Sequence, residues 1–178
     1  MAKVKIKKFM DYLNERVGVN LYVWGANDES IVTLLPKLTS METDPANLKR
    51  VLTLLNKRLL ENGDIWKIRC DDCSGLFIGF ALENKILKSD TTADGIYNAI
   101  NNDIPLTDVQ AGDFLFMGTK KKKDHVGYAI SSDYAIEARG RDYGVVMTKI
   151  KDRKWKFAAR SNWFSGVDKY VKNQKGEV

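Results

Sequence analysis

The segment Asp72-Cys73-Ser74-Gly75 stands directly before the apolar run 76–82, and this junction constrains the fold more than any other part of the chain. The apolar run predicts a buried helix, with Asp72 capping its start and Gly75 permitting a close backbone approach. A helix start exposes unpaired N–H groups and the positive end of the helix dipole, which lower the pKa of a nearby thiol. We therefore predict that Cys73 is a nucleophile, against the alternative of a small buried apolar side chain.

His125 is the only histidine of the chain and lies far downstream of Cys73. A cysteine of low pKa and a distant histidine are the minimal set for covalent acyl transfer, in which the imidazole takes the thiol proton. Because no second imidazole competes for the role, we predict that His125 is the base. The alternative is a surface histidine or one whose hydrogen bonds are satisfied in the core.

The second half of the chain predicts an antiparallel sheet, because short apolar segments alternate with turn residues. His125 precedes the predicted strand 126–130, and Glu137 lies in the next strand, 134–138. The turn at 131–133 would make the two side chains cross-strand neighbours. We predict that Glu137 orients the imidazole, as the third member of a triad does. The alternative is an exposed carboxylate paired with a nearby arginine, Arg139 or Arg141.

The first half of the chain predicts helices. A leucine-rich stripe over 44–61 begins at an Asp-Pro pair typical of a helix start and stops at Gly63. We interpret 27–64 as a helical insertion, and predict further helices over 3–17 and 92–100 and a cysteine helix that continues to residue 86 or 87. Helices followed by strands at 113–117, 126–130, 134–138 and 155–163 indicate an α+β fold. The prediction is one domain over 1–178, with a frayed tail at 173–178.

The formal charge of +6 and the pI near 9.2 favour an anionic partner. The sequence has no nucleic-acid-binding signature, and no run approaches the length of a membrane span. The basic start of the chain is not followed by an apolar segment typical of a secretion signal, so we expect synthesis in the cytoplasm without a signal peptide. Two cysteines and one histidine are too few for a zinc site, and no metal or cofactor is expected.

Cys70 and Cys73 form a Cys-Asp-Asp-Cys pair, whose spacing matches a thioredoxin-type redox motif. Against that interpretation, Cys73 rather than Cys70 begins the apolar helix, and the two acidic residues between the thiols disfavour a thiolate. A structural disulfide is no better supported in a reducing compartment. We treat Cys70 as a bystander and keep a redox protein as a rival.

Four segments together resemble the NlpC-type family of papain-like cysteine peptidases, the bacterial and phage peptidoglycan endopeptidases. In the family's order, they are Tyr22-Val23-Trp24-Gly25, Asp72-Cys73-Ser74-Gly75, residues 111–116 and the strand opened by His125. The resemblance implies a papain-like fold with Cys73 as nucleophile, His125 as base and Glu137 as the orienting residue. It also implies that Tyr22 lies near the thiol and that Asp72 and Ser74 help to bind the substrate or the oxyanion.

The family commonly cuts the stem peptide of the bacterial wall between D-γ-glutamate and a diamino acid. Two departures accompany the resemblance: the third residue is often histidine where this chain has Glu137, and the stretch 26–71 is longer and more helical than usual. The resemblance implies peptidoglycan as the anionic partner, and a phage or mobile-element lysin that reaches the wall after lysis or in a phage particle. An N-acetylmuramoyl-L-alanine amidase with the same residues and a non-catalytic wall-binding phage component remain alternatives.

Overall fold

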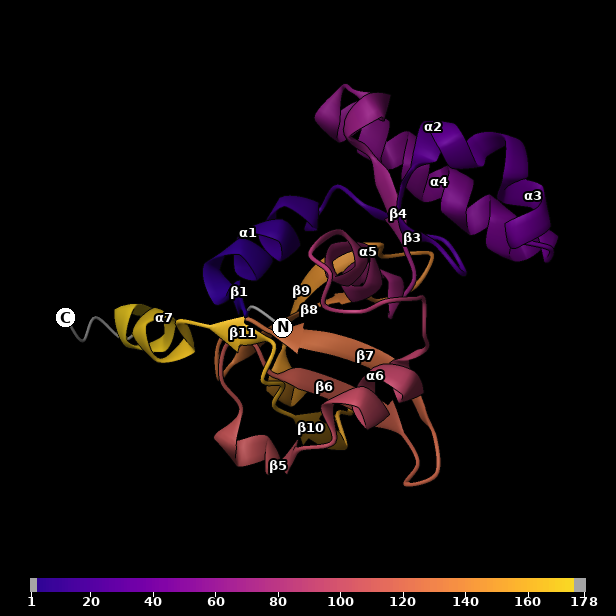
Figure 1. Ribbon diagram of the computed structural model, residues 1–178. Coiled ribbons are helices and arrows are strands. Elements are labelled where there is room, and N and C mark those ends of the chain that lie inside the picture. Colours follow the sequence, from indigo (N-terminus) through magenta and orange to yellow (C-terminus); the bar gives the residue numbers. More distant parts are fainter. Residues whose placement is uncertain (1–2, 175–178) are drawn as a thin grey trace.

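A six-stranded antiparallel sheet forms the centre of the molecule, with α1 and α5 stacked against one side of it (Figure 1). The computed structural model describes residues 3–174. The sheet has the order β5-β10-β6-β7-β8-β9, and its strands are Asp103–Ile104, Phe157–Ala159, Phe114–Gly118, Lys123–Ala129, Tyr134–Ala138 and Val145–Lys149. The predicted α+β class and antiparallel pairing are confirmed, whereas β5 and β9 were not predicted.

The helix α5, Gly75–Glu83, is buried on nearly every side. Its glycines allow this close packing: a Cβ atom on Gly75 would lie 1.8 Å from the carbonyl oxygen of Ala26, and one on Gly79 would lie 2.6 Å from Cβ of Asp28. The predicted close approach at Gly75 is therefore confirmed. The helix ends earlier than predicted, because Asn84 and Lys85 leave the helical conformation and Lys85 adopts a left-handed φ of 57°.

Residues 27–64 form a lobe beside the sheet, at the upper right of Figure 1. The longest helix, α4 (Pro45–Asn62), begins after an Asp44 cap and ends at Gly63 in the left-handed conformation, as predicted. The short helices α2 and α3, Ile31–Leu34 and Leu38–Met41, precede it. The insertion does not begin with a helix, however, because Asn27–Ser30 forms β3 and pairs with β4, Arg69–Asp71.

The lobe is anchored to the loop between β8 and β9 by three polar contacts. Arg141 pairs with Glu42 at 2.7 Å, Arg50 pairs with Asp142 at 2.6 Å, and Arg58 donates to the carbonyl oxygen of Tyr143 at 3.1 Å. The lobe also has an apolar core of its own, separate from the core under the sheet. These contacts fix the lobe against the sheet at the side where β8 ends.

The first and last strands of the chain pair with each other. The predicted first helix is α1, Ile6–Arg16, preceded by β1, Val4–Lys5, which pairs in parallel with β11, Phe164–Ser165. The predicted strand over 155–163 is shorter, because only Phe157–Ala159 enters the sheet. The helices α6 and α7 and the strand β2 are Ala93–Ile100, Val167–Gln174 and Leu21–Tyr22.

Of the predicted frayed tail, residues 173–174 belong to α7, and residues 175–178 lie outside the described part of the chain. Within residues 3–174, no helix combines the length and the apolar character needed to cross a bilayer.

Candidate active site

Cys73 lies two residues before α5, in a turn held by the carboxylate of Asp72. This carboxylate accepts the N–H groups of Ser74 and Gly75 at 2.9 and 2.7 Å, and on its other side the N–H of Gly25 at 3.1 Å. Three backbone donors around the turn are thereby satisfied. The predicted capping role of Asp72 is confirmed, and it fixes the backbone that carries the thiol.

The thiol of Cys73 faces the sheet at β7. The backbone N–H groups of Val126 in this strand, of Ser74 and of Cys73 itself act to lower the pKa of the thiol, which places them near the sulfur. The hydroxyl of Tyr128, two residues further along the strand, donates to the carbonyl oxygen of Cys73 at 2.8 Å. The sulfur is therefore held at the strand residue that follows His125.

The predicted low pKa of Cys73 is wrong. Only 9 % of the residue is exposed, and burial together with the charge of Asp72 raises the pKa of the thiol to about 12. The three backbone N–H groups act in the opposite direction but are outweighed. Desolvation dominates because a thiolate loses its hydration in this position, so the resting form is the neutral thiol.

His125 and Glu137 lie on the same face of the sheet, on neighbouring strands β7 and β8. Nε2 of the imidazole is 2.7 Å from Oε2 of Glu137, whose side chain is completely buried. No hydrogen bond to Nδ1 is found within residues 3–174, and none joins the imidazole to the Cys73 thiol there. The structure thus brings His125 and Glu137 into direct contact, and brings Cys73 to the adjacent Val126.

Two side chains that the sequence did not single out complete the surroundings of Glu137. Arg153 donates from Nε to Oε1 at 2.6 Å and from Nη2 to Oε2 at 2.8 Å, and Thr148 donates to Oε1 at 2.8 Å. Burial alone would raise the pKa of Glu137, but the hydrogen bonds from His125 and Arg153 outweigh it and lower the pKa to about 2. Glu137 is therefore an ionised carboxylate, and it pairs with Arg153 rather than with Arg139 or Arg141.

The indole of Trp155 covers the imidazole. The two rings are nearly parallel, with an interplanar angle of 10° and centroids 5.6 Å apart. No local pattern links Trp155 to His125, since the two residues meet only because β10 lies beside β6 and β6 beside β7. Their contact limits the directions in which the imidazole can turn.

Tyr22, Asp72 and Ser74 lie around the thiol. Tyr22 packs in the same apolar cluster as Cys73, and burial, with the nearby Cys73 and Asp72, raises the pKa of its hydroxyl. The Ser74 hydroxyl donates to Asp72 at 2.9 Å. Tyr22 thus lies near Cys73, and the Asp72 and Ser74 side chains are hydrogen-bonded to each other.

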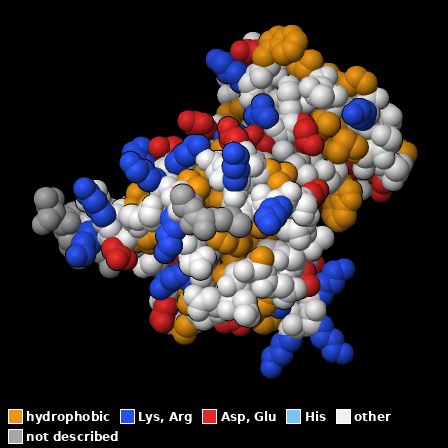
Figure 2. Space-filling model, in the orientation of Figure 1, with side chains coloured by type: hydrophobic (Ala, Val, Ile, Leu, Met, Phe, Trp, Pro, Cys, Tyr) orange, Lys and Arg blue, Asp and Glu red, His pale blue; other side chains and the backbone are white. Residues whose placement is uncertain are grey.

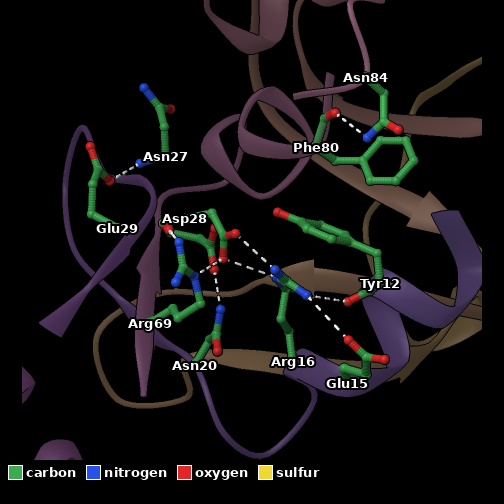
Figure 3. A network of polar contacts seen from close by, with 11 residues as sticks. Tyr12, Glu15, Arg16, Asn20, Asn27, Asp28, Glu29, Arg69, Phe80 and Asn84 are labelled. Atoms are coloured by element: carbon green, nitrogen blue, oxygen red, sulfur yellow. Dashed lines mark hydrogen bonds and ion pairs between the residues drawn. The ribbon is translucent and has the colours of Figure 1, made fainter. Parts of the chain in front are cut away.

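A second polar network surrounds Asp28, which closely approaches Gly79 of α5 (Figure 3). Asp28 receives hydrogen bonds from Arg16 at 2.8 and 3.0 Å and pairs with Arg69 at 2.8 Å. Asn20 donates to the buried Asp71 at 2.6 Å. The network joins α1 to β3 and β4, which lead into the turn that holds Cys73.

Cys70 lies in β4 and is fully buried, and burial raises the pKa of its thiol. Both cysteines are free thiols.

Comparisons with known proteins point to one family. The model of the NlpC/P60 family matches residues 61–163. The chain is similar in fold to the P60 domain of antigen MAP1204 from M. avium subspecies paratuberculosis, with 22% identity, a TM-score of 0.51 and coverage of 87% of this chain and 96% of that domain. No curated protein sequence matches the chain.

It is also similar to NlpC2 and NlpC1 from Trichomonas vaginalis. NlpC2 has 17% identity and a TM-score of 0.57, and the match covers 93% of this chain and 49% of NlpC2. NlpC1 has 16% identity and a TM-score of 0.56, and the match covers 90% of this chain and 45% of NlpC1. The chain therefore spans about half the length of these two relatives. Because the family match covers more than half of the 178 residues, the protein belongs to the NlpC/P60 family.

Proposed function

We propose that this protein is a peptidoglycan endopeptidase that cuts the stem peptide between D-γ-glutamate and the diamino acid, with Cys73 as nucleophile, His125 as base and Glu137 as the orienting residue. One observation carries the proposal: the only imidazole of the chain is bonded through Nε2 to a buried carboxylate at 2.7 Å, on the strand whose Tyr128 hydroxyl binds the carbonyl oxygen of Cys73. The family membership supports the substrate class.

The reaction begins from the neutral thiol, because burial raises the pKa of Cys73 to about 12. Nδ1 of His125 takes the thiol proton as the sulfur attacks the carbonyl carbon, and a C–S bond forms. The oxyanion is stabilised by the N–H of Cys73 and a neighbouring donor. The C–N bond then breaks, and the imidazolium gives its proton to the leaving amine.

Water completes the cycle. His125 takes a proton from a water molecule, whose oxygen attacks the thioester carbon, and the C–S bond breaks. The imidazolium returns its proton to the sulfur, and the stem peptide leaves as a carboxylic acid that loses its remaining proton to solvent, so that the thiol and the neutral imidazole are restored. Glu137 stays ionised throughout, since hydrogen bonds lower its pKa to about 2, and it stabilises the imidazolium that forms transiently.

For the substrate, we propose that Tyr22, Asp72 and Ser74 contact the peptide next to the scissile bond. We propose that the surface rich in Lys and Arg binds the bacterial wall. Lys and Arg side chains are spread over the face drawn in Figure 2, and Lys120, Lys121 and Lys122 are exposed in the hairpin that precedes His125. Such a surface attracts an anionic polymer in a salt-dependent way. The proposal includes a phage or mobile-element lysin that meets the wall after lysis or in a phage particle.

Mass spectrometry of the fragments released from purified peptidoglycan tests the bond. An endopeptidase leaves L-alanyl-D-glutamate on the glycan strand and frees a fragment that begins with the diamino acid. Intact stem peptides would instead show an N-acetylmuramoyl-L-alanine amidase, and no release from several wall types would favour a non-catalytic wall-binding component. Either of these results would contradict the proposal.

A further inference from the structure

Arg153 holds both oxygens of the Glu137 carboxylate, including the Oε2 that faces the imidazole. The guanidinium contacts both carboxylate oxygens, at 2.6 and 2.8 Å, in the two-pronged geometry that only arginine provides. The Arg153 side chain is 20% exposed, whereas that of Glu137 is 0% exposed. The arginine is therefore the cation that compensates a fully buried charge.

The contact fixes the orientation of the carboxylate as well as its charge. Rotating the Glu137 carboxylate out of the guanidinium plane breaks two charge-assisted hydrogen bonds at once. With Arg153 and Thr148 in place, Oε2 is the oxygen that faces the imidazole, at 2.7 Å. Cζ of Arg153 also lies 5.8 Å from the ring centroid of Trp155, which stacks on His125, so Arg153 is a neighbour of both groups that hold the imidazole.

The orientation of Glu137 decides which nitrogen of His125 carries the proton. An ionised carboxylate only accepts, so the neutral imidazole bonded to it must carry its hydrogen on Nε2. Nδ1 then keeps a lone pair and is the nitrogen able to take the thiol proton. The opposite tautomer, with hydrogen on Nδ1, cannot act as a base at that nitrogen.

We propose that Arg153 is a positioning residue of this site: by gripping both oxygens of Glu137, it keeps His125 in the Nε2–H tautomer with Nδ1 ready to accept a proton. The inference rests on the proposed function for its catalytic meaning. The role of Arg153 in setting the tautomer is independent of that function, because the tautomer of His125 can be observed whether or not the protein cleaves peptidoglycan.

The test uses the fact that His125 is the only histidine. In full-length protein labelled with ¹⁵N in histidine, nitrogen chemical shifts and couplings at alkaline pH report the tautomer without any assignment problem. The wild type should show the Nε2–H form alone. In Arg153→Met, which keeps the apolar stem but removes the guanidinium group, both tautomers should appear.

The same variant should also be slower. The turnover number kcat on purified peptidoglycan should fall about 10- to 100-fold with KM unchanged, because a misplaced catalytic group lowers the rate rather than the binding affinity.

Arg160→Met is the matched control. Arg160 grips Asp113 in the same two-pronged way, at 2.8 Å for both contacts, but neither residue touches His125 or Glu137. This variant should lose stability without any change in tautomer. Arg153→Lys keeps the positive charge but not the two-pronged hydrogen bonding, so its kcat should lie between those of wild type and Arg153→Met. If Arg153→Met does not fold, Arg153→Lys is compared with wild type and Arg160→Met instead.

Two results would overturn the inference. One is an Arg153 variant that folds and keeps both the pure Nε2–H tautomer and a kcat within twofold of wild type. The other is a loss of kcat in Arg160→Met equal to that in Arg153→Met. If the wild type itself leaves peptidoglycan intact, the proposed function fails, while the tautomers of the wild type and of the Arg153 variants still decide the role of Arg153.

Discussion

A Cβ atom on Gly127 would lie 2.6 Å from Cη2 of Trp155, so the indole can stack on His125 only because residue 127 has no side chain. The same Cβ atom would lie 3.3 Å from Cβ of Glu137. Gly127 follows His125 by two residues and shares its face of the sheet. The glycine in the His-Val-Gly-Tyr segment is thus explained by the packing of the ring that covers the imidazole.

Gly127→Ala should therefore displace Trp155 and release the imidazole. We expect a loss of about 1–3 kcal/mol in the free energy of unfolding, the usual cost of overpacking, and a lower kcat. Trp155→Phe removes the atoms that the new methyl group meets, so the double variant should recover part of the stability lost in Gly127→Ala. Strictly additive losses in chemical denaturation would contradict this account of the glycine.

The pH dependence of Cys73 alkylation should reveal the imidazole as its base. In His125→Gln, burial and Asp72 keep the thiol neutral up to its pKa of about 12, so the rate should rise about tenfold per pH unit from pH 7 to 10. In the wild type, His125 takes the proton, and alkylation near neutral pH should be faster. The Cys70→Ala background leaves a single thiol. Identical profiles for the two proteins would show that thiol and imidazole are not coupled.

The free energy of unfolding at acid pH should depend on the ion pairs of Glu137. Its folded pKa is depressed from 4.5 to about 2, so the stabilisation is present above the unfolded pKa and is lost as the pH falls from about 5 to about 2. The shift corresponds to about 3 kcal/mol at neutral pH. Glu137→Gln should flatten the free energy of unfolding between pH 5 and 2, as measured by urea denaturation. A variant with the same acid dependence as wild type would exclude Glu137 as its source.

Two of the three arginines that anchor the helical lobe, Arg141 and Arg50, should contribute unequally to stability. Glu42 is almost completely buried and accepts from Arg141 and from the N–H of Trp24. Arg141→Met leaves a buried carboxylate without its cation and should cost about 3–5 kcal/mol. The Arg50–Asp142 pair is half exposed on both sides, so Arg50→Met should cost less than about 1 kcal/mol. Equal losses of stability in the two variants would contradict the assignment.

The sequence predicted the elements whose signals are local. The ends of α4 followed from Asp44 and Gly63, and the pairing of His125 with Glu137 followed from the hairpin turn between their strands. The site residues that the sequence did not predict are placed by contacts between segments far apart in the chain. Arg153 reaches Glu137 from outside the hairpin.

The pKa of Cys73 was predicted in the wrong direction for a similar reason. A helix start is visible in the sequence, but burial is not, and burial outweighs the backbone donors. The strand β3 was also missed, because Asn27–Ser30 has no apolar alternation and is a strand only through its pairing with β4.

In the proposed reaction, the sulfur of Cys73 performs the cleavage. The most direct measurement compares fragment release from purified peptidoglycan by the wild type, Cys73→Ala and Cys70→Ala, each confirmed as folded by circular dichroism. We predict full release by the wild type, near-wild-type release by Cys70→Ala and none by Cys73→Ala. Continued release by Cys73→Ala, with loss of release in Cys70→Ala, would contradict the account.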